Sequence, residues 1–152
     1  LYVYTSADHL HIEHLQKKGN RYHRAESLPA KLPDNAISII GVHGHLYFAA
    51  VRHLENALPG PQHSKNSIVI LRLHANDYLG STGIRFLQRY NARLQENGGC
   101  LLLSGLTPVI MAELQRTSFI NEFGADNLFV ATNIYFESTE KAYQRAEILL
   151  QK

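Results

Sequence analysis

The sequence predicts an α/β fold built on a mixed sheet, and three observations support this class. Short apolar, β-branched segments recur along the chain and are typical of strands. They cover residues 36–42, 68–73, 100–104 and 127–131. The later segments are separated by amphipathic stretches long enough for helices, which favours parallel pairing through helical crossovers. The first strands are separated only by short turns, so we expect antiparallel pairing there and about four helices in all.

Length and composition indicate one folded domain spanning residues 1–152. The chain is 45% hydrophobic and 18% charged, which is ordinary for a folded protein, and its net charge of +2 is too small to argue for a nucleic-acid partner. The single cysteine, Cys100, excludes an internal disulfide and fits a reducing compartment. It lies in an apolar segment, so we expect a core thiol. No apolar stretch reaches the ~18–20 residues of a membrane span, and no signal-peptide pattern is present.

Residues 1–35 form a β-rich N-terminal extension before the core, which we place at residues 36–152. Residues 1–4 have a strand-like pattern. Residues 17–20, Lys-Lys-Gly-Asn, are a turn signal between two further strand-like segments, which predicts a hairpin. The chain begins with a leucine and enters a strand-like segment at once, which suggests a fragment of a longer protein with its missing part upstream.

The stretch from residue 68 to residue 97 is the centre around which the chain is organised. A buried strand leads through a polar loop to Ser81 or Thr82, either of which is placed to cap a helix. Backbone N–H groups converge at such a helix start, and its dipole favours an anion. This is the candidate regulatory, phosphorylatable or anion-docking loop, with five residues: Asp77, Gly80, Ser81, Thr82 and Gly83.

The same helix carries three arginines on one face. Arg85, Arg89 and Arg93 recur at i, i+4 and i+8, and the simplest interpretation is a solvated face. The alternative is a contact with an acidic partner or with anionic lipid headgroups. A separate buried face is predicted from residues at helical spacing: Ile84, Leu87, Asn91 and Leu94.

Helix boundaries in the second half follow from capping signals. Thr107 is a cap followed by Pro108 at the first helical position. Ser138 or Thr139 is expected to cap the final helix. Gly105 is expected to end the strand predicted at residues 100–104.

The order and spacing of five segments resemble the STAS domain. This is the fold of anti-sigma factor antagonists and of the cytoplasmic C-terminal tail of SulP-type anion transporters, the sulfate permease family. The β-rich prefix and the Gly-x-Leu-Tyr-Phe turn favour the transporter branch. The resemblance covers roughly residues 36–150. The matching segments are residues 44–48, 68–73, 80–84, 100–105 and 128–132.

Membership of the transporter branch implies a function and a set of partners. It implies a non-catalytic module that regulates, assembles or stabilises a transporter of an inorganic anion such as sulfate or bicarbonate. The partner is then the transmembrane domain of the same polypeptide, at the cytoplasmic face of the bacterial inner membrane. A homodimer is expected in the parent, with the exposed first strands as the route of self-association. No cofactor is expected.

The chain departs from the antagonist pattern at an informative place. Antagonists have Asp-Ser-Ser-Gly with the second serine phosphorylated, whereas here the segment is Gly80-Ser81-Thr82-Gly83. Thr82 takes the phosphorylatable position, but the neighbouring carboxylate is missing. Two alternatives therefore stay open beside the transporter domain. They are a free-standing phospho-switch that acts on a kinase or sigma-regulatory partner, and a nucleotide- or anion-binding sensor.

Metal binding and catalysis have little support in the sequence. The nine histidines include no His-x-x-x-His pair and have no cysteine or acidic cluster to complete a metal site. There is no Gly-x-Ser-x-Gly elbow and no P-loop. Asp77 follows a central strand, where α/β enzymes place working residues, but an aspartate there more often shapes the loop.

Overall fold

The computed structural model describes residues 10–25, 27–44, 46, 48–74 and 78–152. Six strands form one mixed sheet in the order β2-β1-β3-β4-β5-β6. β1 pairs antiparallel with β2 and β3, and the pairs from β3 to β6 are parallel. The predicted fold class is therefore confirmed. The strands are β1 (His11–Lys18), β2 (Arg21–Arg24), β3 (Ile37–His43), β4 (Ile68–His74), β5 (Cys100–Leu106) and β6 (Leu128–Val130).

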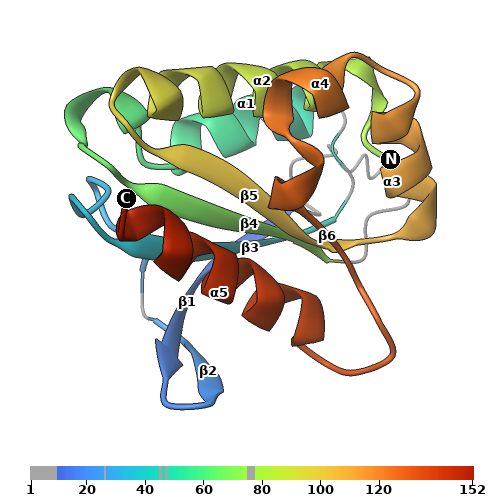
Figure 1. Cartoon of the computed structure of the whole chain (residues 1–152). Coiled ribbons are helices and arrows are strands. Elements are labelled where there is room, and N and C mark those ends of the chain that lie inside the picture. Colours follow the sequence, from blue (N-terminus) through green and yellow to red (C-terminus); the bar gives the residue numbers. More distant parts are fainter. Residues whose placement is uncertain (1–9, 26, 45, 47, 75–77) are drawn as a thin grey trace, which may run out of the picture.

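The helices lie on the two faces of this sheet. Figure 1 shows α1, α2 and α4 over one face and α5 over the other. The structure describes one more helix than the four predicted, because the short α4 follows α3 directly. The five are α1 (Phe48–Ala57), α2 (Gly80–Glu96), α3 (Pro108–Gln115), α4 (Phe119–Phe123) and α5 (Glu137–Leu150).

Because both faces are covered, strand β4 is apolar on both sides. Its Val69, Leu71 and Leu73 belong to the larger core beneath α1 to α4. Ile68 and Ile70 belong to the smaller core beneath α5. This two-sided burial explains the nearly continuous apolar run in the sequence.

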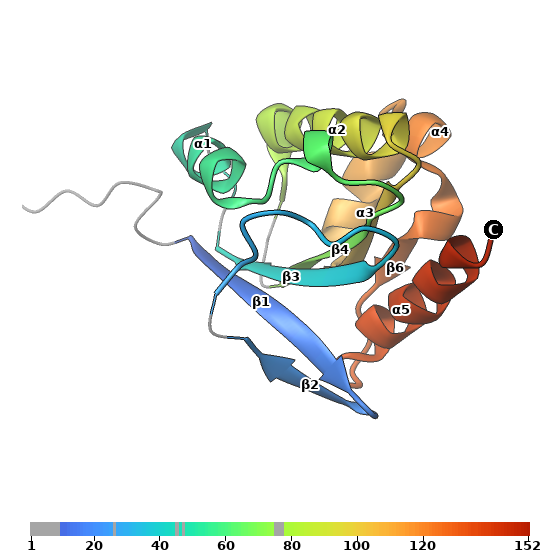
Figure 2. The ribbon, with the colours of Figure 1, turned by 90° about the vertical axis from the view of Figure 1, so that its left-hand side faces the viewer.

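The predicted hairpin is confirmed as β1 and β2, which extend from one edge of the sheet (Figure 2). Gly19 adopts a φ of +62° in the turn between them. The strand expected at residues 1–4 lies outside the described residues.

Ser138 and Thr139 do not cap α5, so this prediction is wrong. Both hydroxyls are buried and point to β5 instead. Ser138 Oγ accepts a hydrogen bond from the backbone N–H of Gly105 at 3.0 Å, and Thr139 Oγ1 lies 2.9 Å from Ser104 Oγ. The helix begins at Glu137, after Phe136, which is two residues earlier than a Ser138 cap and three residues earlier than a Thr139 cap would require. The two hydroxyls therefore attach the helix to the sheet.

Gly105 does not break β5, contrary to the sequence-based expectation. The strand runs on to Leu106, with Gly105 at a φ of +68° and a shift in the β5–β6 register between Leu103 and Leu106. A left-handed glycine inside a strand produces a local bulge and not an end. The Gly105 N–H is then satisfied by Ser138.

A polar cluster joins the hairpin to α5. Tyr22 Oη donates to Glu140 Oε1 at 2.6 Å, and Lys17 Nζ lies 2.9 Å from the same carboxylate. Partial burial opposes ionisation of Glu140, but the hydrogen bonds from Tyr22 and Lys17 and the lysine charge hold its pKa below the ordinary value. Burial, with the neighbouring Glu140 carboxylate, raises the pKa of Tyr22.

This cluster predicts a specific acid sensitivity. A carboxylate whose folded pKa is lowered stabilises the protein above its unfolded pKa, near 4.5, and loses that contribution as the pH falls through the folded pKa. We expect the melting temperature of the wild type to fall more steeply below this value than that of Glu140→Gln. Glu147→Gln, an exposed change on the same helix, should follow the wild type. Parallel profiles for wild type and Glu140→Gln would contradict this.

Candidate functional site

The start of α2 is held by a side chain from another helix. The helix begins at Gly80, with a φ of +70°, so Ser81 and Thr82 lie inside its first turn and do not cap it as predicted. Instead, Glu113 on α3 accepts from the backbone N–H groups of Leu79 and Gly80, at 2.8 Å and 2.6 Å. A carboxylate is a strong cap because it is charged and can accept both hydrogen bonds at once.

This cap sets the exposure of the predicted loop residues. Ser81 is exposed, Thr82 is half-buried and Gly83 is buried. A Cβ atom on Gly83 would lie 3.5 Å from Leu79 Cβ and 3.7 Å from Leu46 Cβ, so a small residue suits the close packing there. The four residues from Gly80 to Gly83 therefore share one helical turn. Asp77 lies outside the described residues.

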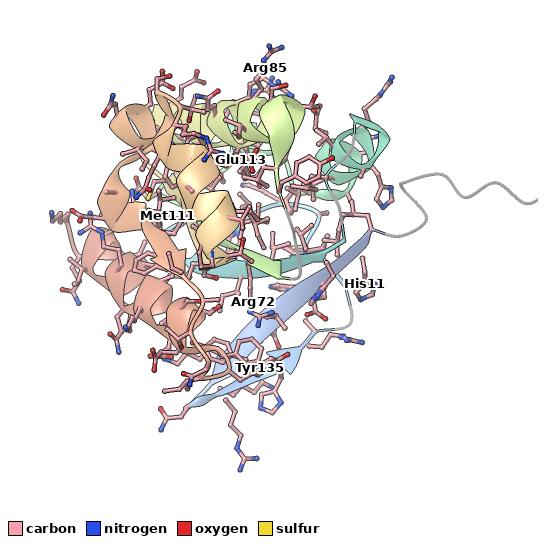
Figure 3. All side chains as sticks on the ribbon, turned by 90° about the vertical axis from the view of Figure 1, so that its right-hand side faces the viewer. His11, Arg72, Arg85, Met111, Glu113 and Tyr135 are labelled. Carbon is pink, nitrogen blue, oxygen red and sulfur yellow. The ribbon has the colours of Figure 1, made fainter. Side chains whose placement is uncertain are left out.

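A hollow of about 400 Å³ lies between the first turns of α2 and the end of α3. Figure 3 shows Arg85 and Glu113 together above the sheet on this side of the molecule. Arg85 and Arg116 are exposed, whereas the Glu113 carboxylate accepts hydrogen bonds from the backbone at the start of α2. The hollow therefore offers two cations and several hydroxyls to a partner. Its lining includes Ser81, Arg85, Gln88, Glu113, Arg116 and Thr117.

The arginine face of α2 borders a second hollow, of about 180 Å³, against α1. Arg85, Arg89 and Arg93 are all exposed, as the solvated-face interpretation predicts. Arg89 forms an ion pair with Glu55 of α1 at 2.7 Å. An exposed pair of this kind contributes at most about 1 kcal/mol. Thr82 and Arg52 also line this hollow.

The predicted buried face of α2 is confirmed at all four positions. Its polar member, Asn91, has a defined role, because Asn91 Oδ1 accepts from the backbone N–H of Leu101 at 3.0 Å. This bond connects the helix to strand β5.

The groups available for chemistry are few in the described part of the chain. It contains no cluster of three or more His, Cys, Asp or Glu side chains placed to hold a metal ion. Burial raises the pKa of Cys100 to about 11, despite the opposing charge of Arg145, so this thiol is protonated near neutral pH. No helix among the described residues is long and apolar enough to cross a membrane.

Two residues of this region were missed by sequence reasoning. Glu113 lies on α3 and Arg116 directly follows that helix, more than 30 residues beyond the start of α2, and no local pattern marks them. A helix cap is recognised in a sequence from the residues next to the helix start. A capping side chain that comes from another helix leaves no such signal.

The family of the chain follows from comparison with known proteins. The model of the STAS domain matches residues 29–141. The chain belongs to the STAS domain family. The resemblance stated from the sequence is thus confirmed. The putative sulfate transporter YvdB of Bacillus subtilis is 25% identical over 114 residues, which are 74% of this chain and 22% of that protein. The STAS chain therefore spans about a fifth of this curated relative.

Solved structures share the STAS fold. A sulfate transporter family protein from Wolinella succinogenes aligns with a TM-score of 0.59 and 22% identity, over 76% of this chain and 88% of that chain. The murine Solute Carrier 26 family member A9 anion transporter aligns with a TM-score of 0.64 and 13% identity, over 90% of this chain and 22% of that chain. These two alignments show that the chain shares its arrangement of sheet and helices with both solved structures.

Proposed function

We propose that this chain is the cytoplasmic STAS domain of a SulP-type anion transporter, in which it regulates, assembles or stabilises the membrane part without catalysing a reaction. The names of its relatives, which are a putative sulfate transporter, a sulfate transporter family protein and an anion transporter, support this proposal. The observation that carries it is the surface at the start of α2. There, an exposed serine and two exposed arginines surround a hollow while the helix start itself is held by Glu113.

This surface suits docking of an acidic segment. Arg85 is on α2 and Arg116 directly follows α3, and the Glu113 bonds fix these two helices against each other. Charges on a preorganised rim raise the rate and the specificity of association with a surface of opposite charge. The proposed partner is an acidic segment of the transmembrane domain of the same polypeptide.

Homodimerisation in the parent belongs to the same proposal. β2 is an edge strand, and no other strand of the described residues pairs with its outer side. Arg21 on this strand is exposed, whereas Arg24 is paired with Glu13. A second copy would have to match the Arg21 charge with a carboxylate, which gives such a dimer a dependence on salt.

A second candidate function is a phospho-switch, and the surroundings of Thr82 favour it. Thr82 lines the hollow that also contains Arg52, Arg85 and Arg89. A phosphate on Thr82 would be placed near cations able to pair with it. Incubation with a cognate kinase followed by mass spectrometry at Ser81 and Thr82 tests this, and an unmodified segment would contradict it. Anion or nucleotide docking at the start of α2 stays a prediction, and such a ligand would compete with Glu113.

The transporter proposal is tested in the complete polypeptide that contains this chain. That polypeptide is expressed with and without residues 36–152, and uptake of labelled sulfate and bicarbonate into membrane vesicles is measured. We expect membrane-spanning segments upstream of the chain, uptake of one of these anions, and reduced uptake or reduced membrane abundance after the deletion. A polypeptide without membrane spans, or equal uptake and abundance in both forms, would contradict the proposal.

A further inference from the structure

Arg72 is a buried cation in the middle of the sheet. It lies on β4 between Leu71 and Leu73 and is only 4% exposed. Within the described residues it is the one charged side chain that is buried to this degree. Its Nε is buried and has no hydrogen-bond partner in that part of the chain. Burying a charge without a hydrogen-bonded counter-ion is strongly unfavourable, so this arginine needs an explanation.

Two aromatic rings cover the guanidinium. The centre of the guanidinium lies 4.4 Å from the ring centroid of Phe136 and 5.3 Å from that of Tyr135, and Figure 3 shows Arg72 beside Tyr135 at this end of the sheet. Ring faces attract a cation but do not accept the in-plane N–H groups along its edge. The aromatic contacts therefore offset part of the cost of burial and leave the Nε–H without an acceptor among the described residues.

The backbone of Phe136 is itself strained. Its φ of 64° lies in the left-handed region, which is unfavourable for a bulky side chain. The ring is held by stacking on Tyr22, with centroids 4.8 Å apart, as well as by Arg72. Strain of this kind concentrates at ligand-binding positions. Here the strained residue, Phe136, lies against the guanidinium of Arg72, whose Nε has no hydrogen-bond partner among the described residues.

The acidic and hydroxyl side chains next to Arg72 in the sheet already interact with other residues. Glu13, Gly41, Arg72 and Ser104 follow one another across four strands in register. The Glu13 carboxylate lies 2.9 Å from Arg24 Nε and 3.0 Å from His43 Nε2. Although burial opposes it, these contacts hold the pKa of Glu13 below its ordinary value. The Ser104 hydroxyl is paired with Thr139.

The N-terminus of α5 adds a second source of positive potential. Phe136 directly precedes this 14-residue helix, so the guanidinium lies close to its start. The dipole of a helix favours an anion at this end. The Nε and one Nη of an arginine form a planar fork that matches the two oxygens of a planar oxyanion.

We propose that Arg72 anchors a binding site for a free, small, planar oxyanion, either a carboxylate or bicarbonate, at the start of α5 beneath Tyr135 and Phe136. The anion accepts hydrogen bonds from the Nε–H and the adjacent Nη–H and supplies a counter-charge for which the described residues provide no ion pair. This site lies on the α5 side of the sheet, opposite the α2 surface. Its test is therefore independent of the docking function proposed above.

The test uses the isolated chain and two arginine variants. Melting temperatures are measured in increasing sodium formate and sodium bicarbonate against sodium chloride of equal ionic strength. We expect a saturable rise of about a few degrees in the wild type and in Arg21→Met, an exposed control on β2. The rise should be absent in Arg72→Met, whose melting temperature in chloride should equal or exceed that of the wild type.

A spectrum of the wild type keeps the test valid even if Arg72→Met folds poorly. The arginine Nε–Hε resonances are followed by ¹H–¹⁵N NMR, with Arg72→Lys identifying the Arg72 signal by its absence. Saturable movement of this signal with formate or bicarbonate supports the site. An unmoved Arg72 signal would overturn the proposal, as would an equal melting rise in Arg72→Met.

Discussion

Replacing Gly99 by alanine is expected to destabilise the domain by about 3 kcal/mol or more, enough to unfold a marginally stable protein. Gly99 lies between the end of α2 and the start of β5. A Cβ atom there would overlap the backbone oxygen of Ser67 and lie 3.0 Å from the backbone nitrogen of Ser67. The obstacle is backbone at the start of the central strand, which cannot move without disturbing the pairing of β4 with β5. Urea unfolding measures the loss.

Gly19→Ala is the matched control for this substitution. Gly19 has a φ of +62°, but a Cβ added there would meet no described atom within 4 Å apart from those of Gly19 itself and its two neighbours in the chain. Its replacement should therefore cost only backbone strain, about 1 kcal/mol. Equal losses for the two variants would show that the contact at Ser67 is not the cause.

Removing the carboxylate of Glu113 is the second change with a large expected effect. Glu113→Ala leaves the N–H groups of Leu79 and Gly80 without their acceptor, and Leu79 is buried. Charge-assisted hydrogen bonds of this kind contribute about 1.5–3 kcal/mol, so we expect a loss in that range. Glu113→Gln keeps one acceptor and should lose less. The loss should appear in the unfolding free energy and as faster amide exchange in the first turn of α2.

Glu122→Ala serves as the control, since Glu122 is exposed on α4 and its bond to Gln88 is long, at 3.3 Å. It should change stability by less than about 0.5 kcal/mol. If Glu113→Ala behaved like Glu122→Ala, Glu113 would not be the cap of α2.

The fold was predictable wherever the determining signal was local. Strand β4 follows from its unbroken apolar run, and the buried face of α2 follows from helical spacing. The Thr107 cap and Pro108 are also local, and Thr107 Oγ1 accepts from the Ile110 N–H at 3.1 Å as expected. Propensity and period suffice in these places because each residue interacts with neighbours a few positions away.

The misses share a non-local cause. Ser138 and Thr139 resemble caps in sequence, yet β5 takes their hydroxyls across 33 to 35 residues. The cap of α2 comes from Glu113, which is equally distant in sequence. A hydroxyl near a helix start satisfies whichever buried group the fold presents, and a single sequence does not reveal that group.

The candidate site was predicted in part for the same reason. Gly80 to Gly83 gather on one turn because they are consecutive, whereas Arg116 joins them only through the packing of α3. Arg72 did carry a signal, since one arginine interrupts the apolar run of β4. That interruption is visible in the sequence, but its meaning depends on Phe136, which lies 64 residues further on.

The most direct test of the docking function is a charge reversal in the complete transporter polypeptide. Arg85→Glu combined with Arg116→Glu reverses the surface at the start of α2 without touching the core. Lys65→Glu, an exposed charge reversal just before β4, is the matched control. If this surface docks an acidic segment, the double variant should fold with an unchanged melting temperature and lower anion uptake or transporter assembly several-fold, while Lys65→Glu leaves both intact. Uptake and assembly equal to the wild type in the folded double variant would contradict a docking role for this surface.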